Sequence, residues 1–307
     1  GTSEQDGGVG GKRDAGDAAL DEDAIARGWE HLATPVEDTL NAVHGTAADD
    51  VWAVGLRGVI VHFDGTSLTR HVSGTFEELH DVWAIARDDV WAVGDAATAL
   101  HYDGQRWSRV AIHPPLQPFE TVSAFRSVSA TGPDDIWILP AGTTSLNGNV
   151  AGPFVMHFDG TSWTPYERGE DFMFERKIFA AHDEAWVLSS ERVQQGFGRF
   201  WRNVTPVSEG VTYEDLWVSG EGRPWLLTDD AGAGNRVFVY DGFNWTETEG
   251  DGLRDGYARG IWAGDAGEAG AVGLFGCVNY FDGRSWCVVD AGHERGVYLD
   301  DVFVVGG

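Results

Sequence analysis

The sequence repeats one tryptophan-containing phrase six times, and this repetition limits the fold more than any other feature does. A copy reads D-D-V-W-A-V-G, then a short apolar run, then H-[FY]-D-G-x-x-W, and the divergent copies keep parts of this phrase. The copies span residues 49–68, 89–107, 134–163, 183–204, 223–245 and 268–286. A period of about 40 to 50 residues is typical of proteins built from similar small units that pack on one another.

One copy contains four predicted strands. In the second copy, apolar and polar residues alternate over 79–85, and a continuous apolar run follows at 90–93. Two further runs, 98–102 and 107–110, flank Asp103-Gly104. Asp-Gly between strands is a strong hairpin signal, because glycine adopts positive φ without strain. Each repeat therefore predicts a four-stranded antiparallel unit, and a ring of such units is an all-β fold, the β-propeller.

The repeats cover residues 28–307, which we expect to form a single propeller domain. Residues 1–27 are rich in Gly, Asp and Ala and contain almost no large apolar side chain, so we expect a flexible leader. The 14 tryptophans fall in the repeat register, which favours packing between blades over ligand stacking.

Three histidines also recur in the repeat: His62, His101 and His157 each precede an aromatic residue and Asp-Gly. Equivalent positions on different blades do not meet at one metal ion, so we expect these side chains to form contacts within their own blades. Asp50, Asp89 and Asp135 lie in the predicted turns between the first two strands, where aspartate commonly bonds its own backbone.

The number of blades depends on the two ends of the chain. Innermost strands are predicted to begin near Leu40, Leu79, Phe125, Phe174, Tyr213, Tyr257 and Tyr298. The last of these, 297–305, has no second or third strand after it, whereas Trp29 opens a segment that resembles an isolated outermost strand. We expect a seven-fold layout with an incomplete closing blade. Three alternatives stay open: a sequence that is cut short, six blades with two displaced strands, and missing strands supplied by another chain.

The D-G-x-x-W hairpin resembles the turn of the Asp-box family, and the whole repeat is similar to kelch-like and Asp-box-like propellers over residues 28–307. This resemblance implies the fold but no single function, because propellers include lectins, hydrolases, lyases and scaffolds. The strict motif S-x-D-x-G-x-T-W is not kept, so a glycosidase function is not implied. The leader resembles the spacer of processed bacterial lipoproteins. That resemblance implies an exported bacterial protein at the cell surface, in the periplasm or outside the cell, and leaves a lipid anchor open.

Charge and hydropathy exclude two classes of partner. The formal net charge of −28 repels nucleic-acid phosphates and anionic lipids. No apolar run approaches the roughly 18 residues of a membrane span. We therefore expect no nucleic-acid partner and no membrane-spanning segment.

Loop length varies on only one side of the predicted ring. The long connections are 113–121, 141–152, 166–172, 191–198, 229–235 and 248–256. All of them join either the second and third strands or successive blades, and those two kinds of loop emerge on the same face. Variable loops on a rigid scaffold are where binding usually occurs, although unconstrained drift of the loops is the alternative. The candidate binding residues are Tyr166, Glu167, Arg168, Glu170, Asp171, Phe172, Asp229, Asp230, Asp251, Arg254, Asp255 and Tyr257.

Two smaller features bear on export and on metal binding. Cys277 and Cys287 flank the sixth hairpin, and we expect them to face one another and form a disulfide; two buried thiols are the alternative. Glu249, Asp251 and Asp255 are spaced somewhat like a calcium loop, but Leu253 replaces a ligand and no EF-hand is predicted. We expect no metal site and no cofactor, with a looser Ca²⁺ site as the open alternative.

No catalytic motif is present: the sequence contains no Walker loop, no H-E-x-x-H and no G-x-S-x-G. We therefore expect no catalytic residues and a non-catalytic, exported module that binds a protein or carbohydrate ligand on the loop-rich face. Two alternatives remain. One is a propeller enzyme, a lyase or glycoside hydrolase with acidic residues at the channel mouth. The other is a structural subunit that self-associates through strand addition at the incomplete blade.

Overall fold

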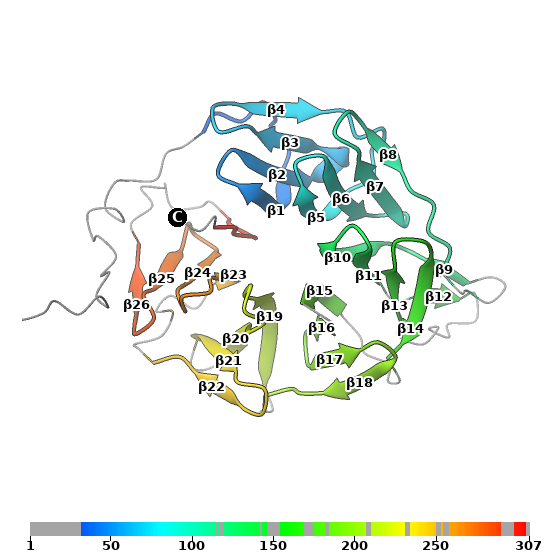
Figure 1. Cartoon of the computed structure of the whole chain (residues 1–307). Coiled ribbons are helices and arrows are strands. Elements are labelled where there is room, and N and C mark those ends of the chain that lie inside the picture. Colours follow the sequence, from blue (N-terminus) through cyan, green and yellow to red (C-terminus); the bar gives the residue numbers. More distant parts are fainter. Residues whose placement is uncertain are drawn as a thin grey trace, which may run out of the picture.

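Six four-stranded antiparallel sheets stand around a central axis in the computed structural model of the chain (Figure 1). This arrangement confirms the all-β propeller. The structure describes residues 32–114, 116, 120–141, 143–145, 154–168, 175–181, 184–206, 210–230, 234–249, 253, 258–289 and 298–304. Within each sheet the strands follow chain order from the axis to the rim. The N-terminal residues 1–27 lie outside the described part of the chain.

The blades are numbered in chain order. Blade 1 contains β1 Leu40–Ala47, β2 Asp50–Gly55, β3 Ile60–Phe63 and β4 Leu68–His71, with the 3₁₀ turn η1 Leu56–Gly58; blade 2 contains β5 Leu79–Ala86, β6 Asp89–Gly94, β7 Thr98–Tyr102 and β8 Trp107–Arg109. Blade 3 contains β10 Phe125–Gly132, β11 Asp135–Pro140, β13 Phe154–Phe158 and β14 Trp163–Glu167; blade 4 contains β15 Glu175–Ala181, β16 Glu184–Ser189, β17 Val193–Phe197 and β18 Phe200–Asn203. Blade 5 contains β19 Val211–Val218, β20 Pro224–Asp230, β21 Gly234–Tyr240 and β22 Trp245–Glu247; blade 6 contains β23 Ala258–Ala263, β24 Ala269–Gly273, β25 Val278–Phe281 and β26 Trp286–Val288.

The Asp-Gly hairpins form where the sequence predicts them, and the aspartate side chain explains why. In blade 2, Oδ1 of Asp103 accepts the backbone N–H groups of Gln105 and Arg106 at 3.0 and 2.9 Å. Gly104 follows with a φ of 83°. A carboxylate that caps two backbone donors, followed by a residue free to adopt positive φ, makes this turn locally self-sufficient.

The recurrent histidines are structural, as predicted. In blade 1, Oδ1 of Asp50 lies 3.1 Å from the Trp52 indole nitrogen and 2.8 Å from Nε2 of His62. The His62 ring stacks on Trp52 with 4.1 Å between centroids. Blades 2 and 3 repeat the trio with Asp89, Trp91, His101 and with Asp135, Trp137, His157. The expectation that these aspartates bond their own backbone was wrong, because a neighbouring indole and imidazole both need an acceptor there.

Tryptophans fill the space between blades. Each second-strand tryptophan of blades 1–4 meets, edge to face, a tryptophan in the outermost strand of the next blade, with centroids 5.5 to 6.4 Å apart. These pairs are Trp52–Trp107, Trp91–Trp163, Trp137–Trp201 and Trp186–Trp245. Edge-to-face contacts add about 0.5–1.5 kcal/mol each to the burial of apolar area. The packing role predicted from the repeat register is confirmed for these residues.

The described residues form six blades, so the alternative of six is confirmed and the favoured seven-fold layout is wrong. One extended segment, Tyr298–Val304, lies between blade 6 and blade 1 (Figure 1). The Leu299 N–H donates to the Gly273 carbonyl at 3.2 Å, and Tyr298 bridges to Leu274. The segment occupies an innermost-strand position, but no described strand pairs along its outer edge. Trp29 lies outside the described residues.

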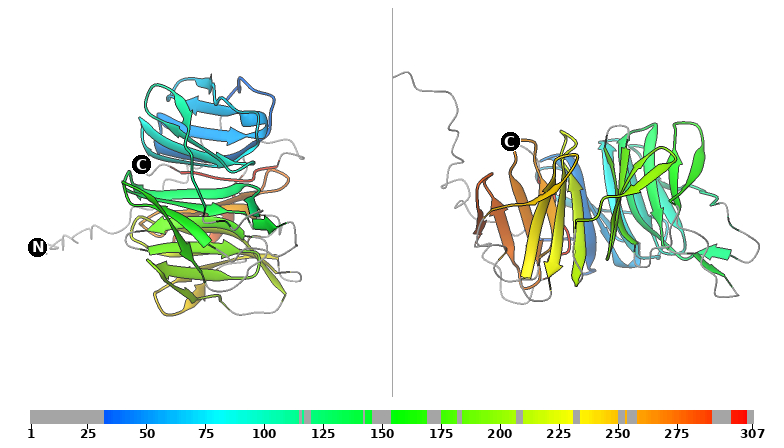
Figure 2. Two further views of the ribbon diagram at one scale, coloured as in Figure 1. Left: turned by 90° about the vertical axis from the view of Figure 1, so that its right-hand side faces the viewer. Right: turned by 90° about the horizontal axis from the view of Figure 1, so that it is seen from below.

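The two longest connections pair with one another. β9 (Glu120–Val122) precedes blade 3, β12 (Thr143–Ser145) lies within the connection between β11 and β13, and the two form a short antiparallel ribbon. Figure 2 shows this ribbon projecting from the ring. On the loop-rich face, the connections at blade 3 therefore form regular secondary structure.

The predicted disulfide is absent. The hairpin register pairs Tyr280 with Cys287, which leaves Cys277 further along the strand, and no bond joins the two cysteines. Instead, the Asn279 amide nitrogen lies 2.9 Å from Sγ of Cys277, and Sγ of Cys287 lies 3.4 Å from the Tyr280 carbonyl oxygen. The prediction failed because it centred the turn on Asp282, whereas the pairing of Phe281 with Trp286 centres it later.

Candidate functional site

The innermost strands begin with a bulge, which shapes the channel mouth. In blade 2 the register shifts between Leu79 and Asp81, and the inner strands of the other five blades shift at the same place. A bulge sets two consecutive residues opposite one partner, so both approach the same side of the strand. The first residue of each pair, together with Asp300 of the 298–304 segment, forms what we call the mouth ring: Asn41, His80, Arg126, Arg176, Glu214, Arg259 and Asp300. The second residue of each pair, together with Asp301, forms the deep ring: Ala42, Asp81, Ser127, Lys177, Asp215, Gly260 and Asp301.

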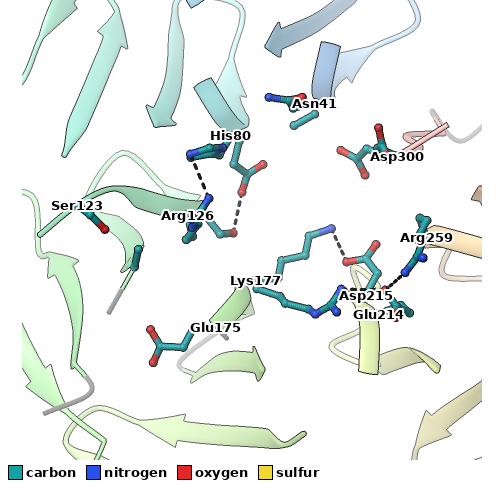
Figure 3. Close-up of a pocket in the computed structure, with 16 residues that line it drawn as sticks. Asn41, His80, Ser123, Arg126, Glu175, Lys177, Glu214, Asp215, Arg259 and Asp300 are labelled. Carbon is teal, nitrogen blue, oxygen red and sulfur yellow. Dashed lines mark hydrogen bonds and ion pairs between the residues drawn. The ribbon is translucent and has the colours of Figure 1, made fainter. Parts of the chain in front are cut away.

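These rings line a cavity of about 730 Å³ on the loop-rich face, with Gly260 as the one member outside its lining. Figure 3 shows side chains from different blades converging there, with Lys177 reaching toward the centre and Arg259 turned toward Glu214. Ser123, Ala141 and Glu175 complete the wall. The cavity is thus built mainly from strand residues and only at its edge from loops.

Lys177 is the centre of the deep ring. Its Nζ lies 2.8 Å from Oδ1 of Asp215. Burial alone would lower the pKa of Lys177, but the carboxylates of Asp215, Asp301 and Asp81 outweigh burial and raise it. The ammonium group therefore stays charged at neutral pH. Burial raises the pKa of Asp301 to about 7 and also raises the pKa of Asp81, in both cases against the attraction of Lys177.

Three deep-ring aspartates also bind their own blade or segment to the next blade. The Val128 N–H donates to Oδ2 of Asp81 at 2.9 Å. The same contact joins Ile261 to Asp215 at 2.8 Å and Val43 to Asp301 at 2.9 Å. Every one of these carboxylates accepts a backbone donor from a different blade or segment, so the cluster has a structural role.

The mouth ring presents three arginines. Nη1 of Arg176 and Nη1 of Arg259 both donate to one oxygen, Oε2 of Glu214, at 2.8 and 2.7 Å. Glu214 is almost fully buried, whereas the two arginine side chains are 36% and 39% exposed. One carboxylate oxygen engages only one N–H of each guanidinium, and a guanidinium has five. Glu214 therefore leaves most donors of both arginines, which line the cavity, unused.

Arg126 is the third arginine and is exposed. Its Nη1 lies 3.2 Å from Nε2 of His80, which also lies 2.8 Å from Oδ1 of Asp95. One imidazole nitrogen does not donate to Asp95 and accept from Arg126 at the same time. When His80 bonds Asp95, the Arg126 guanidinium is available to a ligand.

The residues predicted to bind ligand are dispersed. Tyr166 packs on Trp137 with 5.6 Å between centroids, and Glu167 lies exposed at the end of β14. Arg168 is buried, forms an ion pair with Glu175 and donates to Oε1 of Gln194 at 2.9 Å. Burial lowers its pKa to about 9, so it remains charged at neutral pH.

The other predicted binding residues are either absent from the cavity lining or outside the described residues. Asp229 and Asp230 end β20, and Asp230 lies 3.7 Å from the Arg236 guanidinium. Glu170, Asp171, Phe172, Asp251, Arg254, Asp255 and Tyr257 lie outside the described residues. None of the described members lines the channel cavity, and the set stays a prediction.

Metal-binding clusters and membrane-spanning helices do not occur in the described part of the chain. No group of three or more His, Cys, Asp or Glu side chains is arranged to hold a metal ion there. Asp251 and Asp255, on which the looser Ca²⁺ site depends, lie outside it. None of the described helical segments is long and apolar enough to cross a membrane.

Sequence reasoning missed Arg126, Arg176 and Arg259. A signal was present: an arginine stands two residues before Val128, Ile178 and Ile261, at the same register in three repeats. The recurrent tryptophans indicate packing between blades, and the variable loop lengths indicate binding at the loops. Neither pattern points to the inner strands. Only the bulge shows that these inner-strand positions open into a cavity.

No protein-family model matches the chain, and no curated protein sequence matches it significantly. Solved structures are similar in fold. "YCF48 bound to D1 peptide" matches with a TM-score of 0.66 and 17% identity over 89% of this chain and 90% of that one. The WD40 propeller domain of Doa1 matches with a TM-score of 0.60 and 10% identity over 82% of each chain.

A third similar structure is the extracellular domain of the one-component system BT4673 from B. thetaiotaomicron, with a TM-score of 0.65 and 12% identity. The match covers 90% of this chain but only 37% of that one. At such identities, the likeness establishes the fold alone. The chain is therefore a β-propeller whose channel mouth, on the loop-rich face, is lined by three arginines.

Proposed function

We propose that this propeller is a non-catalytic protein-interaction module that binds a carboxylate-bearing peptide segment at the channel mouth. The observation that carries the proposal is the clustering of Arg126, Arg176 and Arg259 around one cavity. Carboxyl groups also line this cavity, but Glu214 pairs with Arg176 and Arg259, and three aspartates surround Lys177.

Arginine suits this ligand class. A guanidinium presents parallel N–H donors that match the two oxygens of a carboxylate, and such charge-assisted bonds are about twice as strong as neutral ones. Glu214 holds Arg176 and Arg259 by a single oxygen, which orients them without using up their donors. A peptide C-terminus or a Glu or Asp side chain would complete their bonding.

The size and position of the cavity also favour a peptide. A volume of about 730 Å³ at the axis admits a few residues of an extended chain, and the β9–β12 ribbon stands on the same face. A propeller of similar fold is described as bound to a peptide, which supports the same mode of use here. The resemblance of the leader to lipoprotein spacers supports export, and a fold match to an extracellular domain agrees with it.

The second candidate is an enzyme, and one observation favours it: the pKa of Asp301 is raised to about 7 in a central cavity. A carboxyl with such a pKa is a common general acid. Against this role, Oδ2 of Asp301 accepts the Val43 N–H and Oδ1 accepts the Val302 N–H, so both oxygens are engaged. Burial accounts for its pKa without a catalytic task.

Binding of defined peptides tests the proposal. The probes are a fluorescein-labelled Glu-Gly repeat peptide with a free C-terminus, the same peptide amidated, and a Lys-Gly counterpart. We expect fluorescence polarisation to detect only the glutamate peptides, with affinity falling as salt rises. Arg126→Gln should weaken binding by about tenfold, the equivalent of about 1.4 kcal/mol.

Arg106→Gln is the matched control, because it removes the same charge from an exposed turn outside the cavity. Equal binding of lysine and glutamate peptides, or equal losses for the Arg106 and Arg126 variants, would exclude the proposed site. Binding of oligogalacturonate but of no peptide would favour a carbohydrate ligand instead. Turnover of a chromogenic glycoside that Asp301→Asn abolishes would support the enzyme.

A further inference from the structure

Aromatic rings close the channel below the deep ring. They stand two residues further along the innermost strands: His44, Trp83, Phe179, Trp217, Trp262 and Phe303. The His44 and Trp83 rings stack with 4.0 Å between centroids, and Phe179 meets Trp217 edge-on at 4.9 Å. Phe303 lies 4.7 Å from His44. These rings separate the polar cluster around Lys177 from the opposite mouth.

A second cavity, of about 950 Å³, lies on the far side of these rings. Its floor is formed by His44, Trp83, Phe179, Trp217 and Trp262. Its wall comes from the turns that follow the innermost strands of blades 5 and 6, which include Gly220, Asp265 and Glu268. This mouth belongs to the face with short, uniform turns, where loop length predicted no binding.

Glu268 gives this cavity a specific chemistry. Its Oε2 atom is buried and has no hydrogen-bond partner among the described residues. The side chain lies on Gly264, where the methyl group of an alanine would overlap Oε1 of Glu268 and come within 2.8 Å of the Trp262 ring. The carboxylate is thus held beside an indole, and its Oε2 atom is covered by the surrounding protein. A buried carboxylate oxygen without a donor is costly, so a donor or cation is expected there.

The lining carries carboxylates and no opposing side-chain charge. Asp265 and Glu268 are its acids, and no described lining residue is Lys or Arg. Burial lowers the pKa of His44 to about 3, with Lys177 adding to the effect, so His44 is neutral at physiological pH. From the other cavity, Nζ of Lys177 lies 6.0 Å from the Trp217 ring centroid. The ammonium group of Lys177 is thus a cation that already lies near one ring of this aromatic floor.

We propose that this second cavity binds an alkylammonium cation, with the methyl or methylene groups on the indole faces and the charge beside Glu268. Aromatic faces attract cations through the ring quadrupole, and tryptophan is the ring that attracts them most strongly. A carboxylate at the edge of the aromatic floor also attracts the positive charge of the ligand. A neutral ligand of the same shape lacks this attraction. The site is independent of the arginine mouth, which takes the opposite charge.

Choline and 3,3-dimethyl-1-butanol distinguish a charged from a merely apolar ligand, because they have the same shape and differ in charge. Tryptophan fluorescence and calorimetry of the full chain should show binding of choline and not of the alcohol. Glu268→Gln should weaken choline binding by about fivefold, or about 1 kcal/mol. Gly264→Ala should do the same without changing charge, because the new methyl group displaces the carboxylate.

Asp88→Asn is the control, since Asp88 is an exposed acid in a turn on the same face and outside the cavity. Thermal melts confirm that each variant is folded. No choline binding, equal binding of the alcohol, or equal effects of the Asp88 and Glu268 variants would overturn the proposal. A lysine-containing peptide that competes with choline would identify a protein side chain as the source of the cation, whereas failure to compete would assign a free amine. Arg126→Gln should leave choline binding unchanged, which separates this test from that of the peptide site.

Discussion

Asp301 accepts the backbone N–H of Val43 through Oδ2 at 2.9 Å, and this bond joins two residues 258 positions apart in the chain. It repeats the contact that Asp81 and Asp215 make with the blades that follow them. The closing contact of the ring is therefore the same in kind as the contacts between its internal blades.

Removal of this bond should loosen the ring. Asp301→Ala leaves the Val43 N–H without its acceptor, and we expect the free energy of unfolding to fall by about 1–3 kcal/mol. Asp301→Asn keeps an acceptor oxygen and should lose less. Urea unfolding measures both. A loss for Asp300→Ala as large as that for Asp301→Ala would contradict this role, because Asp300 is exposed in the mouth ring.

Stability should also depend on the protonation of Asp301. Burial raises its folded pKa from 3.8 to about 7, so the folded protein binds this proton more tightly than the unfolded chain does. The contribution is complete below pH 4 and is lost as pH rises through about 7. The free energy of unfolding of the wild type, minus that of Asp301→Asn, should therefore fall from about pH 4 to about pH 8. Parallel pH profiles would refute the assignment.

Asp89, which both a tryptophan and a histidine contact, should contribute more to stability than the adjacent Asp88. Asp89→Ala leaves the Trp91 indole N–H and His101 Nε2 without the acceptor that lies 3.2 and 2.8 Å from them. We expect a loss of about 1–3 kcal/mol by chemical unfolding. Asp88→Ala, at the adjacent exposed position, should change stability by less than about 0.5 kcal/mol. Similar losses at both positions would argue against the trio.

Close contact between the first two strands of blade 2 should forbid a side chain at Gly94. A Cβ there would overlap the Glu78 carbonyl oxygen and lie 2.9 Å from Cα of Leu79, and neither backbone atom can rotate away. Gly94→Ala should cost about 3 kcal/mol or more, or prevent folding. At Gly270, also in a second strand, the nearest atom lies 3.9 Å away. Thermal melts should show Gly270→Ala near the wild type; a tolerated Gly94→Ala would count against the register of β5 and β6 at Leu79.

The two thiols should remain unlinked. Because Cys287 faces Tyr280 across the hairpin, we expect a thiol reagent to titrate both cysteines in denaturant without prior reduction. The melting temperature should then be insensitive to dithiothreitol. A reducible crosslink within the monomer would show that the hairpin register differs from the one described.

Local sequence patterns were enough to predict the strands and turns. Alternation of apolar and polar residues over 79–85 matches β5, and Asp103-Gly104 forms the predicted hairpin. Such features depend on residues close in sequence, so a reader of the sequence can find them. The disulfide prediction was wrong because it depended on the exact register of the hairpin. The observed register places Cys277 away from Cys287.

The sequence predicts binding residues in the variable loops, whereas the proposed arginine mouth lies on the same face but is formed by inner strands. Tyr166 and Arg168 belong to variable loops or strand ends, yet they pack against Trp137 and Glu175. Arg126, Arg176 and Arg259 stand on regular strands, where sequence patterns suggest only structure. Their convergence requires three blades to be placed around one axis.

The sequence by itself determined the unit: four strands, an Asp-Gly hairpin and a tryptophan that packs on the next blade. These are short-range choices, set by side-chain periodicity and by the conformational freedom of glycine. Only the tertiary structure decided the number of blades, the place of Tyr298–Val304 and the two cavities at the ends of the channel. Ring closure and channel electrostatics depend on groups that lie hundreds of residues apart, such as Asp301 and Val43, and meet only when all the blades have packed.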